Sequence, residues 1–222
     1  IATLASVTDA HYSVAIGKSA LTVLTTGWAT GIGYEAGVAH TQASGCTYIG
    51  YKSGLRFGEN TNSDNNTFIG HLAGAGGHTT EANNTGGDNV GIGFQAFAGG
   101  TGASTSITAD YCVAIGYNSL TAISTGNSNI AIGYNSGAAL NTGAENTIIG
   151  GYAGDAITDT RDCTLIGYTA GTAINNTSAN GTVAIGHAAL ATLTTGTGNT
   201  AIGYRALNTC DDGSYNTAVG YK

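Results

Sequence analysis

A short phrase recurs along almost the whole sequence, and this repetition constrains the fold more than any other feature. Each copy centres on an apolar anchor, Ile in eleven copies and Val in the last, and a Gly always follows it. The ground spacing between anchors is 17 residues, within a range of 16 to 23. A repeat of this length, copied twelve times, indicates a solenoid in which each copy forms one coil. The anchors are Ile16, Ile32, Ile49, Ile69, Ile92, Ile115, Ile132, Ile149, Ile166, Ile185, Ile202 and Val219.

The residues around each anchor predict a short strand, with positions counted from the anchor as offset 0. Offset −2 is β-branched in every copy, and β-branched side chains at −2 and 0 suit one face of a strand. Offset −1 points the other way and is most often Ala or Gly. The Gly at +1 is expected where a Cβ would obstruct a turn or a close backbone approach. We expect the anchors to form the core ladder of the stack.

Together these features predict an all-β fold, a parallel β-solenoid or β-roll of about twelve coils of ~17 residues. Residues 1–222 are expected to form a single domain. Small residues at offset +4 and apolar residues at +8 predict a second buried element in each coil. The complete absence of Pro fits continuous strand pairing, because each Pro would delete a ladder hydrogen bond. Insertions at 58–65, 74–88, 99–110 and 175–181 should decorate one edge, as a binding face or as tolerated length variation.

Charge and motif content exclude several functional classes. Six basic residues against thirteen acidic ones argue against nucleic-acid binding, which requires clustered Lys and Arg. Phrases that imitate nucleotide-binding motifs, such as residues 31–36 and 91–96, are copies of the repeat without a following helix. No carboxylate pair or metal-ligand cluster recurs, so we predict no enzymatic activity, no cofactor and no metal site. The sequence lacks Met and begins at Ile1, from which we expect a fragment or processed portion of a longer fibre protein.

An aromatic ladder is expected at offset +2, where Phe94, His71 and His187 substitute for Tyr in three copies. Such a ladder can be purely structural, through ring stacking, or it can be a contact surface that docks sugar rings. Polar residues at offset +3 would lie beside this ladder, namely Lys52, Asn118, Asn135 and Arg205. This hypothetical surface-contact ladder comprises Tyr34, Tyr51, Tyr117, Tyr134, Tyr168, Tyr204 and Tyr221.

Three of the four cysteines occupy one slot, offset −3, in copies 3, 6 and 9. Copies three apart stand ~14 Å apart along a parallel stack, beyond the reach of a disulfide. We therefore predict no disulfide within the chain. Small buried thiols and a bond between equivalent slots of neighbouring chains remain the two interpretations. The cysteines are Cys46, Cys112, Cys163 and, at offset +8, Cys210.

The repeated phrases at 13–17, 129–134 and 199–207 resemble the head repeats of trimeric autotransporter adhesins of the YadA type. They also resemble the Asn-Thr-Ala-Ile-Gly-Tyr repeats of phage tail-fibre proteins, and the resemblance extends over essentially the whole chain. It implies a left-handed β-roll, a homotrimer around a common axis and an extracellular role in adhesion or receptor binding. The 17-residue coil is longer than the ~14 residues of the adhesin repeat.

From this resemblance we expect a structural and receptor-binding segment of an extracellular fibre, on a virion or a cell surface. Its partners would be further copies of the chain and a cell-surface glycan or host receptor, with no nucleic acid and no membrane insertion. Two alternatives remain. One is a self-assembling filament subunit that polymerises through its open coil ends. The other is an ice-binding solenoid, because Thr is abundant at offset −2.

Overall fold

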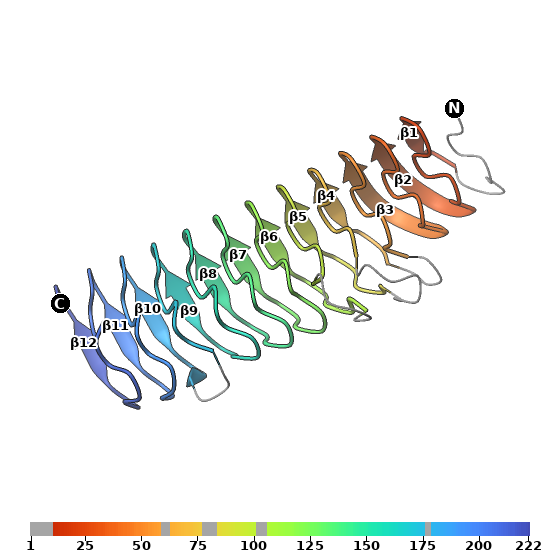
Figure 1. Ribbon diagram of the computed structural model, residues 1–222. Helices are drawn as coiled ribbons and strands as arrows, with labels where there is room; N and C mark the ends of the chain where they lie inside the picture. The colour runs from red at the N-terminus through yellow and green to blue at the C-terminus, as the bar shows by residue number, and fades with distance from the viewer. Residues whose placement is uncertain (1–10, 59–62, 77–83, 101–105, 176–178) are drawn as a thin grey trace.

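The computed structural model describes residues 11–58, 63–76, 84–100, 106–175 and 179–222. In this part of the chain twelve strands form one sheet in sequence order, and neighbouring strands are parallel. The coils stack into a rod with the two termini at opposite ends (Figure 1). This confirms the predicted all-β parallel solenoid. The strands are β1 (Val14–Ile16), β2 (Thr26–Ile32), β3 (Gln42–Ile49), β4 (Thr67–Ile69), β5 (Val90–Ile92), β6 (Val113–Ile115), β7 (Ile130–Ile132), β8 (Thr147–Ile149), β9 (Thr164–Ile166), β10 (Val183–Ile185), β11 (Thr200–Ile202) and β12 (Thr217–Val219).

Strand pairing follows the repeat, so equal offsets around each anchor lie side by side. Between β6 and β7, for example, Val113 pairs with Ile130 and Ile115 with Ile132. The longer strands β2 and β3 shift register once, between Trp28 and Ala29. Because every coil meets its neighbours at the same offsets, each side-chain type forms a line along the rod.

The glycine after each anchor is required by the contact between successive coils. A Cβ added at Gly133 would lie 2.6 Å from the carbonyl oxygen of Gly150, and φ there is +139°. Gly116 stands in the same relation to Gly133, at 2.3 Å. A Cβ essentially never comes so close to a backbone atom, and this φ favours glycine. The predicted close backbone approach at offset +1 is therefore confirmed.

The predicted core ladder is wrong, because the anchors lie on the outer face of the sheet. None of the twelve belongs to the buried core, and the exposed fraction is 58% for Ile16, 37% for Ile202 and 73% for Val219. The residues at offset −1 face inward instead, and Ala131 and Leu165 are completely buried. The physical reason is space. The coil is narrow, so one side chain per strand, frequently Ala or Gly, fills the interior. The anchors that were expected in the core and lie on the outer face instead are Ile16, Ile32, Ile49, Ile69, Ile92, Ile115, Ile132, Ile149, Ile166, Ile185, Ile202 and Val219.

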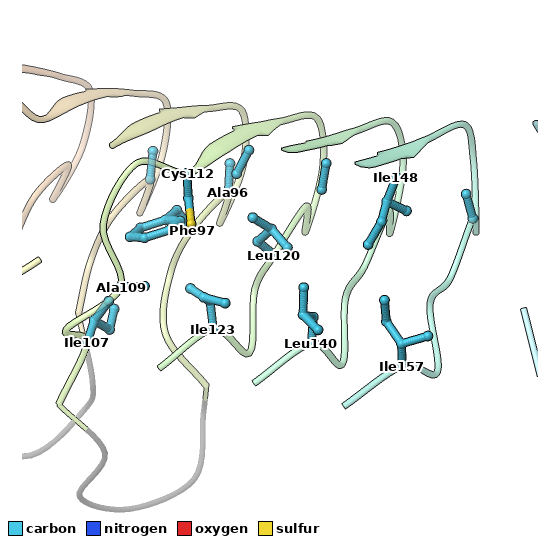
Figure 2. Close-up of a cluster of buried hydrophobic side chains, with 14 of the residues drawn as sticks. Ala96, Phe97, Ile107, Ala109, Cys112, Leu120, Ile123, Leu140, Ile148 and Ile157 are labelled. Atoms are coloured by element: carbon cyan, nitrogen blue, oxygen red, sulfur yellow. The ribbon is translucent and has the colours of Figure 1, made fainter. Parts of the chain in front are cut away.

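The core is completed by the second buried element of each coil. Ile123, Leu140 and Ile157 at offset +8 are completely buried and form a line across the core from the strands (Figure 2). Offset +4 is small and buried as well. Where it is Ser, the hydroxyl donates to the next coil, as from Ser119 Oγ to the carbonyl of Ala131 at 2.7 Å. The predicted apolar positions of this element are thus confirmed.

Offset −3 carries a buried polar ladder that ties consecutive coils together. The backbone N–H of Asn146 donates to Asn129 Oδ1 at 3.1 Å, and Asn129 Nδ2 donates to the carbonyl of Gly143 at 2.8 Å. Cysteine replaces asparagine in this ladder, and the N–H of Cys163 donates to Asn146 Oδ1 at 3.0 Å. Each buried amide therefore finds partners, as polar groups inside a protein require.

The insertions depart from the coil at one edge, as far as the structure describes them. The N–H of Gly58 donates to the carbonyl of Asn84 in the next coil at 3.1 Å, and the N–H of Thr85 donates to the carbonyl of Ile107 at 2.9 Å. These bonds place the insertion boundaries of successive coils side by side. Residues 59–62, 77–83, 101–105 and 176–178 of the insertions lie outside the described part.

One histidine is enclosed in the core. His40 is completely buried, and its Nδ1 lies 2.5 Å from the hydroxyl of Tyr48, which is also completely buried. Its Nε2 has no hydrogen-bond partner among the described residues. Burial lowers the pKa of His40 to about 4, because the charged imidazolium loses its hydration.

Replacing Gly133 by Ala should destabilise the rod by about 2 kcal/mol or more, through backbone strain and the clash with Gly150. The matched control is Gly181→Ala, where φ is also positive, +69°, but nothing lies within 4 Å of the new Cβ. This control should lose only about 1 kcal/mol. Denaturant unfolding followed by circular dichroism measures both changes, and equal losses would contradict the close-contact explanation.

The pKa of His40 predicts an acid-sensitive fold. The folded value of about 4 lies below the unfolded value of 6.5, so the unfolded state binds the proton more readily between these pH values. Stability should therefore fall as the pH drops from 6.5 to 4, by about 3 kcal/mol in total. His40→Gln should remove this component from the pH profile of unfolding. An unchanged profile in that variant would show that His40 is not its source.

Candidate functional site

The outer face of the strands forms a regular surface along the rod, and we call it the outer strip. It consists of the residues at offsets −2 and 0 of β1 to β12, where Thr fills seven of the twelve −2 positions and Ile or Val fills every 0 position. The side chains are partly exposed because their neighbours in adjacent coils flank them. Val14 and Ile130 are exposed by 45% and 38%. The strip therefore presents a row of methyl groups beside a mixed row of methyl and hydroxyl groups.

Strand geometry gives the dimensions of the outer strip. Twelve strands at ~4.8 Å separation extend for about 53 Å, and two side-chain rows spaced by two residues cover a width of about 10 Å. The resulting area is roughly 500 Å², near the upper end for the largest apolar patch on a monomeric protein. The half-exposed rings that follow at offset +2 extend this surface further. Patches of this size are typical of interaction sites.

The predicted aromatic ladder exists and runs along most of the rod. Tyr117 and Tyr134 stack at a centroid distance of 5.0 Å with an interplanar angle of 9°, and Phe94 and Tyr117 at 4.9 Å and 8°. His71 and His187 take part as expected. The predicted tyrosines are partly exposed, with fractions of 41% for Tyr204 and 53% for Tyr168. Tyr134 stacks on Tyr117 on one side only, and Tyr168 stacks on His187. The stacking interpretation is thus also confirmed for the remaining ladder residues Tyr34, Tyr51, Tyr117, Tyr204 and Tyr221.

The stack changes character at β8, where Gly151 occupies offset +2. Tyr152, at offset +3, replaces the missing ring and lies tilted by 59° to Tyr134 and edge-on to Tyr168 at 85°. The repeat pattern does not predict this participation, because Tyr152 lies one position beyond the ladder. A hydrogen bond with Tyr134 raises the pKa of Tyr152, and one with Glu35 raises that of Tyr34.

Stacking limits what the ladder can bind. A sugar docks on an aromatic residue through the flat face of the ring, but neighbouring rings cover both faces within the stacked segments. What remains accessible is mainly ring edges and hydroxyl groups.

Cations lie near several rings of the ladder, including Lys52 over Tyr51 at 5.5 Å and Arg205 over Tyr204 at 5.5 Å. The expected polar partners Asn118 and Asn135 turn their Oδ1 atoms into buried positions without a hydrogen-bond partner. The role of the ladder as a contact surface stays a prediction.

The cysteines have the environment of structural thiols. Cys46, Cys112 and Cys163 are buried free thiols, and burial raises the pKa of Cys112 and Cys163 to about 11. They are therefore protonated at neutral pH and poor nucleophiles. Burial also keeps these three slots out of reach of a neighbouring chain. Cys210 is a free thiol of intermediate exposure.

A second set of aromatic residues, at offset −4, was not anticipated from the sequence. Tyr12, Trp28, Tyr111 and Tyr215 are exposed by 96%, 54%, 65% and 79%. We call them the corner aromatics, because offset −4 precedes the strand at Tyr12, Tyr111 and Tyr215; Trp28, at the same offset, lies within the longer strand β2. The sequence signal for them was weak, since only four of twelve copies carry an aromatic residue there.

Searches for metal and membrane features return nothing in the described ranges. They contain no group of three or more His, Cys, Asp or Glu side chains placed to hold a metal ion. Nor do they contain a helix of the length and hydrophobicity needed to span a bilayer.

Comparisons with known proteins return no match of any kind. No protein-family model matches the chain, and no curated protein and no solved structure is significantly similar to it.

Proposed function

We propose that this chain is a structural and receptor-binding segment of an extracellular fibre, in a tail fibre of a phage or the head of a bacterial surface adhesin. The observation that carries the proposal is the outward orientation of the anchors. In all twelve coils the apolar anchor, the most regular apolar residue of the repeat, lies on the outer surface rather than in the core. A rigid rod with such a surface suits a protein that displays repeated contacts along its length, because several weak contacts combine into strong binding.

The partner of the outer strip in this proposal is the same chain, in a homotrimer. A strip area of roughly 500 Å² per chain, enlarged by the half-exposed rings, approaches the ~800 Å² that each partner contributes to a standard interface. The strip repeats with the same spacing in every copy of the chain, so two strips can align along the rod axis. The net charge of −7 has little influence here, because the strip itself carries no charged residue.

Light scattering coupled to gel filtration tests the trimer with a double variant in adjacent coils, Ile132→Lys and Ile149→Lys. The wild type should have three times the 21.9 kDa chain mass, and the double variant should be a monomer. Two buried lysines would lose hydration without a compensating partner. Circular dichroism should remain that of the wild type, because both side chains point outward.

The control is Thr142→Lys, which introduces one lysine at an exposed position near Leu140, across the core from the strands (Figure 2), and is compared with the single variant Ile132→Lys as well as with the double variant. It should remain trimeric. A monomeric wild type at micromolar concentration contradicts the proposal. Unfolding of the double variant would instead show that these anchors are needed inside the coil.

A filament of coils stacked end to end is the first alternative. The coil that ends in β12 leaves Leu207 and Cys210 only partly buried, although residues in equivalent slots elsewhere are fully buried. A further coil would cover them, whether it comes from the same chain or from a second copy. Mass that grows continuously with concentration, in place of a fixed trimer, would favour this alternative.

Ice binding is the second alternative, and the outward orientation of offset −2 favours it. Thr147 and Thr164 lie in register on neighbouring strands at the ~4.8 Å strand spacing, on a rigid outer face. If ice is the ligand, the wild type should inhibit ice recrystallisation, and Thr147→Lys with Thr164→Lys should reduce this activity while Thr142→Lys retains it. Recrystallisation at the rate of a buffer control would exclude ice binding.

A further inference from the structure

Three of the four corner aromatics occupy a backbone position that disfavours them, and the fourth, Trp28, lies within β2 without a positive φ. φ is +62° at Tyr12, +59° at Tyr111 and +59° at Tyr215, which lies in the left-handed region. Such a conformation costs about 1–2 kcal/mol for a residue with a side chain and is easiest for Gly, Asn and Asp. Other coils follow this preference with Asn65 and Asp88 at the same offset. Tyrosine at this corner therefore has a local cost that a smaller residue would avoid.

Neither the core nor the ladder offsets this cost, since the rings point into solvent. The described structure shows no ring stacking for Trp28, Tyr111 or Tyr215, whereas Tyr12 contacts His11 edge-on at 6.2 Å. The same slot is small in one of the adjacent coils in each case: Gly45 after Trp28, Ser128 after Tyr111 and Gly198 before Tyr215. On the other side, Tyr12 precedes Trp28 and Asp88 precedes Tyr111. Small neighbours leave the adjacent side of the Trp28 and Tyr111 rings accessible. The Tyr215 ring lies against Gly198, where an added Cβ would be 2.9 Å from its Cδ1, and is exposed on its other side. The corner aromatics thus differ from the ladder, whose rings cover one another.

Polar groups held in fixed positions lie beside the corner aromatics. Asp110, the residue before Tyr111, accepts the N–H of Gly87 at 2.7 Å, and Asn127 accepts the N–H of Asp110 at 3.0 Å. Ser214, the residue before Tyr215, accepts the N–H of Thr197 at 3.2 Å. Each of these side chains is anchored by the preceding coil, so an amide, a carboxylate or a hydroxyl stands next to a ring.

The charge at this corner narrows the ligand class. Four of the six basic residues, Lys18, Lys52, Arg205 and Lys222, lie over rings of the ladder, at the other end of the strand. Around Tyr111 the charged neighbours are Asp88 and Asp110, which would repel sulfated or carboxylated polymers. A ligand with apolar C–H faces and neutral hydroxyl groups fits both the rings and their neighbours.

We propose that the corner aromatics bind neutral carbohydrate, with hexose rings stacked on the faces of Trp28, Tyr111 and Tyr215. This inference rests on the proposed adhesive function and names its ligand class. Trp28, Tyr111 and Tyr215 belong to the second, sixth and twelfth coils, so they stand about 19 Å and about 29 Å apart along the rod. Contacts at this spacing suit a polysaccharide chain or a dense glycan layer, and each added contact raises the avidity.

Affinity gel electrophoresis with mannan, dextran, galactomannan and glycogen tests the proposal, with heparin as the charged comparison. At least one neutral polymer should retard the wild type, and heparin should not. The triple variant Trp28→Ala, Tyr111→Asn, Tyr215→Asn should lose at least tenfold in affinity. Trp28 is the only tryptophan, so its fluorescence should shift to shorter wavelength when the retarding polymer binds.

Stability separates a binding role from a structural one. Tyr111→Asn and Tyr215→Asn place a residue that tolerates the left-handed region, so the melting temperature should be unchanged or higher. The matched control Tyr117→Ala removes a ladder ring and should lower the melting temperature while retaining the polymer binding.

Retardation by no neutral polymer, retention of binding by the triple variant, or binding of heparin alone would each overturn the proposal. These outcomes are independent of the trimer measurement. A trimer that binds no neutral polymer would support the fibre proposal and overturn the carbohydrate proposal. A monomer that binds a neutral polymer would support carbohydrate binding and contradict the trimer.

Discussion

The close approach of one coil to the next is the constraint on which the rest of this structure depends. At offset +1 successive chains come so near that a Cβ at Gly133 would lie within 2.6 Å of a carbonyl oxygen. This contact keeps all twelve strands in register, and the register turns each offset into a line of identical neighbours. The asparagine ladder, the stacked rings and the outer strip all follow from it, because none could form if the coils slipped by one residue.

The repeat was sufficient to predict the solenoid, the coil length, the glycine contact and the ring stacking, since each depends on spacing alone. It did not decide which face of the strand is buried. The presence of two β-branched residues and one small residue in each strand favours the β-branched pair as core, yet a narrow coil holds only one inward side chain per strand. The polarity pattern carried the missing signal. Offset −2 is often Thr, as in Thr147 and Thr164, whereas Tyr48 is the one residue at offset −1 with a polar group in its side chain. The corner aromatics escaped notice because they occur in only a few coils.

Reversing the faces of the strand changes the functional picture of the molecule. The interior is filled by small residues, asparagines and buried thiols, and it serves the stack alone. The exterior divides into an outer strip, which we propose contacts a second copy, a ladder whose rings stack on one another, and exposed rings at the opposite end of the strands. Self-association and ligand contact can therefore use different sides of one strand, and a fibre can do both at once.

The most direct test of the central claim is a distance between copies at the middle of the outer strip. A nitroxide attached to Ile132→Cys, in a Cys210→Ser background, reports this distance by electron paramagnetic resonance. Packed sheets stand about 10 Å apart, so the account predicts a dipolar distance of roughly 10–20 Å between labels on neighbouring copies. A label at Thr142→Cys should give a longer distance. A spectrum without dipolar coupling at position 132, from a folded protein, would contradict the claim that the strip joins the chains.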